Sequence, residues 1–310
     1  MHHSGNVMPR ECVGVPCNGG GWVLPHPGLC RRGSGRLLRL ELIMPLWTCF
    51  QCGAQFPGSD APPRACLICE DERQFVNWQG QNFLTREEMR ARYKIAFRDD
   101  LGIVGLRVEP SFAIGQRALL LPEADGCVMW DCVPLATDEA VAHVRALGGL
   151  KAIAVSHPHF YGAVADWSEA FGGVPVYLHG DDRAFVTRPH PSIVPWSGET
   201  QKLSDDITLL RTGGHFPGAT VLHWTKAAEG RGALFVGDIA MVAMDRRHVS
   251  FMYSYPNYIP LGAAAVRRIA DVIAPLAFDR IFGAWWDRNI AAGAKAAFAA
   301  SVARHLAAIA

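Results

Sequence analysis

Three segments of this 310-residue chain place a metal-binding or acidic side chain directly after an apolar stretch with the length of a β-strand. The pairs of stretch and side chain are 151–155 with His157 and His159, 207–211 with His215, and 233–236 with Asp238. Imidazole nitrogens and carboxylate oxygens are common zinc ligands. Because each of the three segments follows its own predicted strand, all four side chains can converge on one edge of a sheet sandwich, and the pattern predicts a metal site there.

The pattern of apolar residues over 101–310 predicts hairpins first and alternating strands and helices afterwards. Strands are predicted at 102–108, 118–121, 127–131, 151–155, 174–178, 207–211, 219–224, 233–236 and 280–282, and helices after Thr137, at 163–171, at 263–273 and in 291–310. This order indicates sheets inside and helices outside. We therefore expect an α+β fold, an αββα sandwich.

The order of these motifs resembles the metallo-β-lactamase fold superfamily of hydrolases over about 101–290. The matching segments are His157-Pro158-His159, Gly214-His215-Phe216-Pro217-Gly218 and Gly237-Asp238. The resemblance implies that His157, His159 and His215 hold one zinc ion and that Asp238 is a further ligand. It also implies that Asp131, at the end of a predicted strand, is a structural aspartate that orients a ligand.

The sequence departs from the family pattern at the positions that would hold a second metal. Tyr161 and Gly162 stand where the family has Asp and His, and Trp285 and Trp286 stand near its last histidine. We therefore expect one catalytic zinc rather than two, and a mouth narrowed by the two tryptophans.

The resemblance implies a zinc-dependent hydrolase of a small molecule with an ester, thioester or amide bond. Asp238 is then the candidate to accept a proton from the attacking water, and Tyr161 either donates a hydrogen bond to an oxyanion or merely packs. One alternative is a non-catalytic metal-binding or interaction protein that retains the fold. A redox protein is the other, and it depends on the cysteine motif alone.

Four of the nine cysteines form a motif of two CxxC pairs separated by thirteen residues: Cys49, Cys52, Cys66 and Cys69. This spacing predicts a structural zinc ribbon over 44–82, and iron bound by the same thiolates is the alternative. Thr85 and Glu88 form a capping box that starts a helix in a predicted linker, 83–100. Acidic residues outnumber the two nearby arginines, Arg64 and Arg73, so a docking or lid role is favoured over nucleic-acid binding.

Composition bounds the remaining possibilities. Lys+Arg 30 against Asp+Glu 29 gives a net charge of +1, which predicts neither a nucleic-acid nor a membrane partner. Reduced thiols favour a cytoplasmic location. Residues 1–43, rich in Gly, Pro and Arg, are expected to be a disordered leader. The sequence does not indicate an oligomeric state or the natural substrate.

Several other side chains have two interpretations each. His179, followed by Asp181 and Asp182, is either a substitute ligand or pocket base, or part of a surface turn. A second set either binds an anionic or aromatic substrate at the mouth or packs: Arg246, Arg247, Tyr253 and Tyr255. His223 is expected to pack inside its strand, and Cys127 and Cys132 to be buried thiols.

Overall fold

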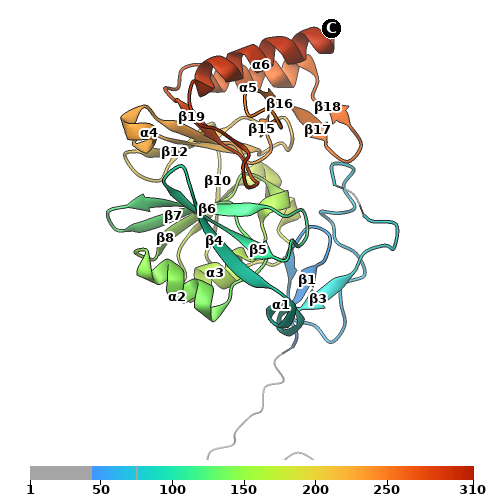
Figure 1. Ribbon diagram of the computed structural model, residues 1–310. Coiled ribbons are helices and arrows are strands. Elements are labelled where there is room, and N and C mark those ends of the chain that lie inside the picture. The colour runs from blue at the N-terminus through green and yellow to red at the C-terminus, as the bar shows by residue number, and fades with distance from the viewer. Residues whose placement is uncertain (1–43, 75) are drawn as a thin grey trace, which may run out of the picture. The chain divides into compact units, whose positions relative to one another are not determined.

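The structure, a computed structural model, describes residues 44–74 and 76–310. The predicted leader, 1–43, lies outside the described residues. Two large β-sheets pack face to face, and helices cover both outer faces (Figure 1). The predicted αββα architecture is confirmed.

The first sheet has seven strands in the order β10-β9-β8-β7-β6-β5-β4. Their bounds are β4 (Lys94–Asp100), β5 (Ile103–Glu109), β6 (Arg117–Glu123), β7 (Gly126–Trp130), β8 (Leu150–Ala154), β9 (Val176–His179) and β10 (Ile193–Trp196). Strands β4 to β7 pair antiparallel as hairpins, and β7 to β10 pair parallel. Hairpins therefore come first and crossovers second, as the sequence predicts.

The second sheet has six strands in the order β11-β12-β13-β14-β19-β20. Their bounds are β11 (Thr200–Lys202), β12 (Ile207–Arg211), β13 (Thr220–Trp224), β14 (Ala233–Phe235), β19 (Arg280–Phe282) and β20 (Asn289–Ile290). Only β14 and β19 pair in parallel, so the segments that follow these two strands leave the sheet at the same edge.

Alternation of side chains along the strands divides the core into layers. In β6, Leu119 and Leu121 point into the cluster between the two sheets, whereas Leu120 packs on the helix side. In β14, Phe235 lies between the sheets, where it stacks on Phe282 at 4.8 Å, and Leu234 faces the opposite way. This period of two is what a strand buried on both faces requires.

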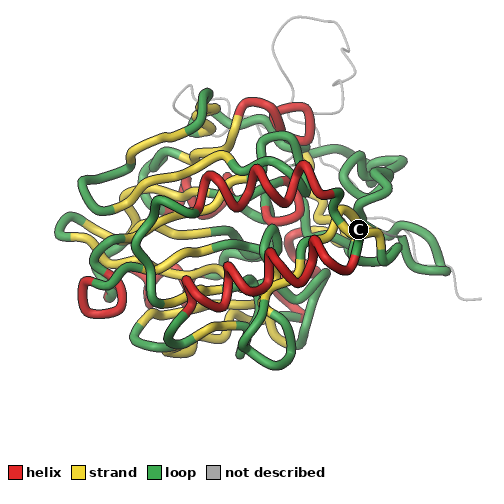
Figure 2. Tube along the Cα trace, turned by 90° about the horizontal axis from the view of Figure 1, so that it is seen from above, coloured by secondary structure: helices red, strands yellow, loops and turns green. Residues whose placement is uncertain are grey.

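The helices cover the outer faces of both sheets. Their bounds are α1 (Arg86–Arg92), α2 (Asp138–Ala146), α3 (Val164–Ala170), α4 (Ala227–Gly230), α5 (Ala263–Ile273) and α6 (Ala294–Ala308), with 3-10 turns η1 (Pro158–Phe160) and η2 (Gly180–Phe185). Helices α2 and α3 pack on the seven-stranded sheet. Helices α5 and α6 lie side by side on the six-stranded sheet (Figure 2). Over 44–74 and 76–310, no helix is long and apolar enough to span a bilayer.

The cysteine module contains a small antiparallel sheet in the order β2-β1-β3. Its strands are β1 (Trp47–Cys49), β2 (Gln55–Phe56) and β3 (Phe83–Thr85). The four cysteines form much of its core, together with Ile68 and three further apolar side chains. Helix α1 follows, and the predicted capping box between Thr85 and Glu88 is present at its start.

The predicted linker, 83–100, is wrong in its second half. Residues Lys94–Asp100 form β4, which pairs with β5 along its whole length and makes the edge of the seven-stranded sheet. Most side chains of β4 are exposed or half-buried, so its sequence lacks the apolar run of a central strand. Two short hairpins were also missed: β15 (Met241–Val242) with β16 (Val249–Ser250), and β17 (Met252–Ser254) with β18 (Ile259–Pro260).

Candidate metal centre

Three loops bring the predicted histidines and Asp238 together. Their four ligand atoms all lie within 4.8 Å of one another, and all four side chains are buried. His157 Nε2 lies 3.1 Å from Asp238 Oδ1. His215 Nε2 lies 3.3 Å from His159 Nδ1 and 4.0 Å from Asp238 Oδ1. The four residues follow the ends of three strands, β8, β12 and β14, which is why the sequence pattern could place them at one centre.

Outer hydrogen bonds determine which atoms of this group face its centre. A carbonyl oxygen can only accept, so His215 Nδ1 donates to Met252 O at 3.1 Å and Nε2 keeps its lone pair. His157 Nδ1 lies 3.0 Å from Ser156 Oγ, which leaves Nε2 for the centre. His157 Nε2, His159 Nε2 and Asp238 Oδ1 are buried without a hydrogen-bond partner. Nitrogen lone pairs beside a carboxylate oxygen are favourable only with a cation or proton between them, so the donor set fits a divalent metal.

Burial shifts the pKa of every member of this group in the direction that favours the neutral form. It lowers the pKa of His215 to about 4 and holds those of His157 and His159 well below their usual value, with the neighbouring His215 as a further cause. Burial, and then the charge of Asp131, raises the pKa of Asp238 to about 8. The imidazoles are therefore neutral at pH 7, which is the form that binds metal.

Asp131 supports His157 from behind through Ser156. The Asp131 carboxylate accepts a 2.8 Å hydrogen bond from Ser156 N, and Ser156 Oγ lies beside His157 Nδ1. Burial raises the pKa of Asp131 to about 7, and its hydrogen bonds with Ser156 act against that rise. Asp131 thus contacts the residue that precedes His157, and its orienting role stays a prediction.

Gly237 lets the loop that carries Asp238 approach this support. Its φ is +55°, and a Cβ there would lie 2.8 Å from Ser156 Oγ. Gly237→Ala is expected to displace Ser156, to destabilise the fold and to weaken metal binding. Gly293→Ala is the matched control, because Gly293 has φ +66° with open space around it.

Denaturant titration with zinc analysis measures both effects. We expect the control to lose about 1 kcal/mol and Gly237→Ala to lose about 1–3 kcal/mol more, because only the second variant adds a steric clash. Equal losses with unchanged zinc content would show that the close approach to Ser156 has no importance.

The residues at the second-metal positions do not join this centre. The Tyr161 hydroxyl donates to Asp182 O at 3.2 Å, and the side chain packs in the core beside the seven-stranded sheet. Its packing interpretation therefore fits the structure better than the role of oxyanion donor. Gly162 has no room for a side chain, because a Cβ would lie 2.9 Å from the carbonyl carbon of Val133.

A cavity of about 390 Å³ opens beside the centre. Its lining residues are Arg73, Gln74, Ile114, His159, Asp238, Met241, Tyr255, Pro256, Trp285 and Arg288. Trp285 lines the cavity, whereas Trp286 does not. The ring of Trp286 lies against Gly105 on the other side of its turn.

The predicted mouth segment after Asp238 contributes only in part. Tyr255 lines the cavity, and its hydroxyl donates to the backbone carbonyl of Asp238. Tyr253 instead donates to Glu72 Oε1 at 2.6 Å. Arg246 lines a different surface hollow, and Arg247 is exposed.

The cysteine module forms one wall of the cavity. Arg73 is ion-paired with Asp71, donates to His215 O at 3.3 Å and lies 3.9 Å above the ring of Phe216. The neighbouring Glu72 O accepts hydrogen bonds from Ser254 and Asn257, both 2.8 Å long. The module thus packs against the loop that carries His215, in agreement with the predicted docking role.

His179 lies apart from the metal group and is neither a ligand nor a surface residue. It is buried, its Nε2 bonds with Gly198 O at 3.1 Å and its Nδ1 accepts from Asp181 N. The adjacent Asp182 is also buried, and its Oδ1 accepts from Gly218 N at 2.8 Å while Oδ2 has no partner. His223 packs as predicted and bonds with Ala277 O.

The burial of Asp182 predicts a pH-dependent stability difference. Burial raises its pKa from 3.8 to about 6, so the folded protein binds this proton more tightly than the unfolded chain does. Wild-type stability should therefore fall as pH rises from about 4 to about 6. As pH rises over that range, the free energy of unfolding of Asp182→Asn should increase by up to about 3 kcal/mol relative to that of wild type. Urea titrations of both proteins at equal zinc content measure it, and parallel pH curves would contradict it.

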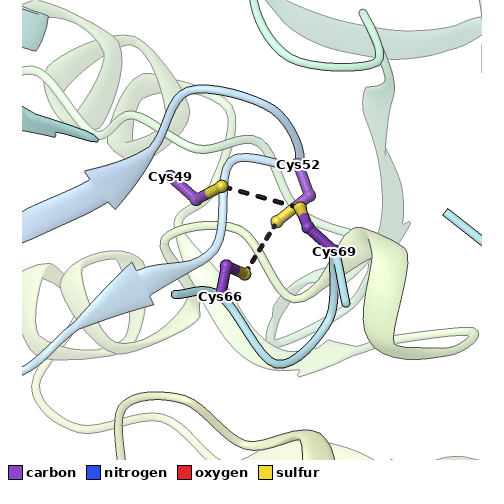
Figure 3. Close-up of side chains that lie close together, drawn as sticks. All are labelled: Cys49, Cys52, Cys66 and Cys69. Carbon is purple, nitrogen blue, oxygen red and sulfur yellow. Dashed lines mark hydrogen bonds between the residues drawn. The ribbon is translucent and has the colours of Figure 1, made fainter. Parts of the chain in front are cut away.

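The four cysteines of the module converge in the same manner as the histidine group (Figure 3). The Sγ–Sγ distances are 3.7 Å for Cys49 and Cys69 and 3.6 Å for Cys52 and Cys66. Disulfide bonds need about 2.05 Å, whereas sulfur atoms about 2.3 Å from a tetrahedral metal lie about 3.8 Å apart. Hydrogen bonds from the other thiols, above all Cys52, lower the pKa of Cys49. The cluster fits a tetrathiolate metal site. Cys127 and Cys132 are buried free thiols, as predicted.

Comparison with known proteins identifies the fold. No family model matches the chain. The crystal structure of VMB-1 at pH 5.5 aligns with TM-score 0.51 and 16% identity over 71% of this chain and 99% of VMB-1. Another similar structure is the metallo-β-lactamase FIM-1 from Pseudomonas aeruginosa in the mono-zinc form, with TM-score 0.49, 14% identity, and coverage of 69% and 96%.

The chain therefore has the metallo-β-lactamase fold, with a four-cysteine cluster that fits a zinc ribbon. Among curated proteins, it is 45% identical over 245 residues to the Uncharacterized protein YmaE of Bacillus subtilis (strain 168), across 78% of this chain and 89% of YmaE. The chain belongs to the family of YmaE.

Proposed function

We propose that this protein is a zinc-dependent hydrolase that cleaves an ester, thioester or amide bond of a small molecule. The observation that carries the proposal is the set of buried, unpartnered atoms on His157, His159 and Asp238 at a cavity. The metallo-β-lactamase fold supports the hydrolase class.

The chain's own residues have distinct roles in this proposal. His157, His159, His215 and Asp238 hold the catalytic zinc. That zinc supplies Lewis-acid chemistry and lowers the pKa of a water molecule toward neutrality. Asp238 is the only carboxylate among the described residues that line the cavity, so we assign it the proton that the attacking water loses. The tight fit at Gly162 supports one metal ion rather than two.

The remaining assignments follow from the cysteine module. We propose that Cys49, Cys52, Cys66 and Cys69 hold a second, structural zinc, with iron as the alternative. Free thiols favour a cytoplasmic location. A small-molecule substrate agrees with the size of the cavity, and we propose no nucleic-acid or membrane partner.

Metal analysis of the purified protein, combined with a panel of esters, thioesters and anilides, tests the proposal. We expect two zinc ions per chain and turnover of at least one panel class. Iron with visible absorbance would overturn the zinc assignment at the cysteines. Full zinc occupancy without any turnover would favour the non-catalytic interaction protein.

A further inference from the structure

Arg288 presents a cation to the cavity without a carboxylate partner. Within 44–74 and 76–310, no Asp or Glu lies within ion-pairing distance of its guanidinium. Nη1 donates to Val242 O at 3.2 Å, and no other side-chain hydrogen bond occupies the group. By contrast, Arg73 on the same cavity is neutralised by Asp71. The Arg288 fork is therefore available for a ligand.

The turn between β19 and β20 fixes the position of Arg288. Its backbone N–H donates to Trp285 O at 3.2 Å, and its carbonyl accepts from Gly283 N at 2.9 Å. The Trp285 indole is anchored in turn to Ile114 O at 2.8 Å. One turn thus presents an indole and a guanidinium to the same cavity, on a backbone that is already ordered.

The charge of the cavity favours an anionic ligand. Among the lining residues that the structure describes, Asp238 is the only carboxylate, and the proposed metal offsets that charge. Arg288 then leaves the cavity with an excess of positive charge, which attracts anions in a confined site. A single planar guanidinium matches one carboxylate with two parallel hydrogen bonds.

Most of the remaining lining is apolar, and Gln74 and Tyr255 are the polar exceptions. Ile114, Met241, Pro256 and Trp285 supply side chains that can pack against an acyl chain. Charged recognition therefore comes from the metal group and the arginines, with apolar surface between them.

We propose that Arg288 binds a carboxylate of the substrate, so that the enzyme acts on acyl compounds that carry a second, anionic end. The reacting bond lies at the His159 and Asp238 side, and the apolar segment packs on Trp285 and Met241. The statement about the reacting bond rests on the proposed hydrolase function. Carboxylate binding by Arg288 does not require turnover.

Calorimetric binding of matched hydroxamates to the zinc-containing protein tests this proposal. The anionic probes are the monohydroxamates of succinic, glutaric and adipic acid, and the neutral probes are the straight-chain hydroxamates of equal length. We expect the anionic probe to bind at least tenfold more tightly at one or more lengths. Arg288→Gln should reduce that ratio to within about twofold, and Arg288→Lys should retain part of it.

Arg304→Gln is the control, because it removes the same charge from an exposed position on α6, and it should keep the full ratio. A wild-type ratio near one at every length, or an undiminished ratio in Arg288→Gln, would overturn the proposal. Absence of any hydroxamate binding would overturn it too. Preference for the anionic probe without turnover of any ester would refute the hydrolase function alone and support carboxylate binding by Arg288.

Discussion

Replacing His215 with alanine is expected to remove one zinc ion per chain and to lower kcat/KM for a substrate ester by about a hundredfold or more. His215 is fully buried, and its Nε2 faces both His159 and Asp238. Alanine leaves no donor atom at that place. Metal analysis and steady-state kinetics on the same preparation measure the two effects together.

His248→Ala is the control for this experiment. His248 lies near the protein surface and pairs with Asp245 at 2.6 Å, away from the metal group. The His248→Ala variant should keep two zinc ions and wild-type kinetics. If His215→Ala retained both zinc ions and full turnover, the proposal that catalysis takes place at this centre would be wrong.

Cys66→Ser is expected to release the other zinc ion and to unfold the cysteine module. Cys66 is fully buried, and the module has few apolar side chains beyond its cysteines. Structural zinc contributes about 10–16 kcal/mol in small zinc domains, so a module of this size cannot fold without it. Zinc analysis and limited proteolysis within 44–85 measure the effect.

Loss of the module should also lower turnover, because Arg73 and Gln74 line the cavity. Cys127→Ser is the control, since that thiol is buried and bonds only with Leu147 O. It should keep both zinc ions. A Cys66→Ser protein with two zinc ions and a protease-resistant module would refute the structural role of the cluster.

The strands with strong apolar runs were predictable, and the exposed edges were not. The predicted strands at 207–211 and 280–282 and the predicted helix at 263–273 have the same bounds in the structure. Their side chains are buried in a regular period, which is what sequence patterns report. Strand β4 owes its place to backbone pairing with β5, and a half-exposed edge leaves little trace in the sequence.

The metal group was predictable because each member follows a strand, whereas the cavity walls were not. Arg73 and His215 are hydrogen-bonded although 142 positions separate them in the chain. A local sequence pattern cannot predict a contact at that separation. Adjacent residues can also face opposite ways, as Trp285 and Trp286 do on one turn. The sequence does not show in which direction each side chain of this turn points, so the prediction placed both tryptophans at the mouth.

Because the cysteine module forms one wall of the cavity, the reactive atoms and part of the substrate-binding surface come from different parts of the chain. The atoms that would perform chemistry come from the large domain, whereas part of the surface that selects a substrate comes from residues 73 and 74. Exchange of residues 44–85 between relatives would therefore change the part of the substrate preference that residues 73 and 74 set, and would leave the reaction and the proposed carboxylate binding by Arg288 unchanged. A set of such chimaeras would reveal how this family diversifies.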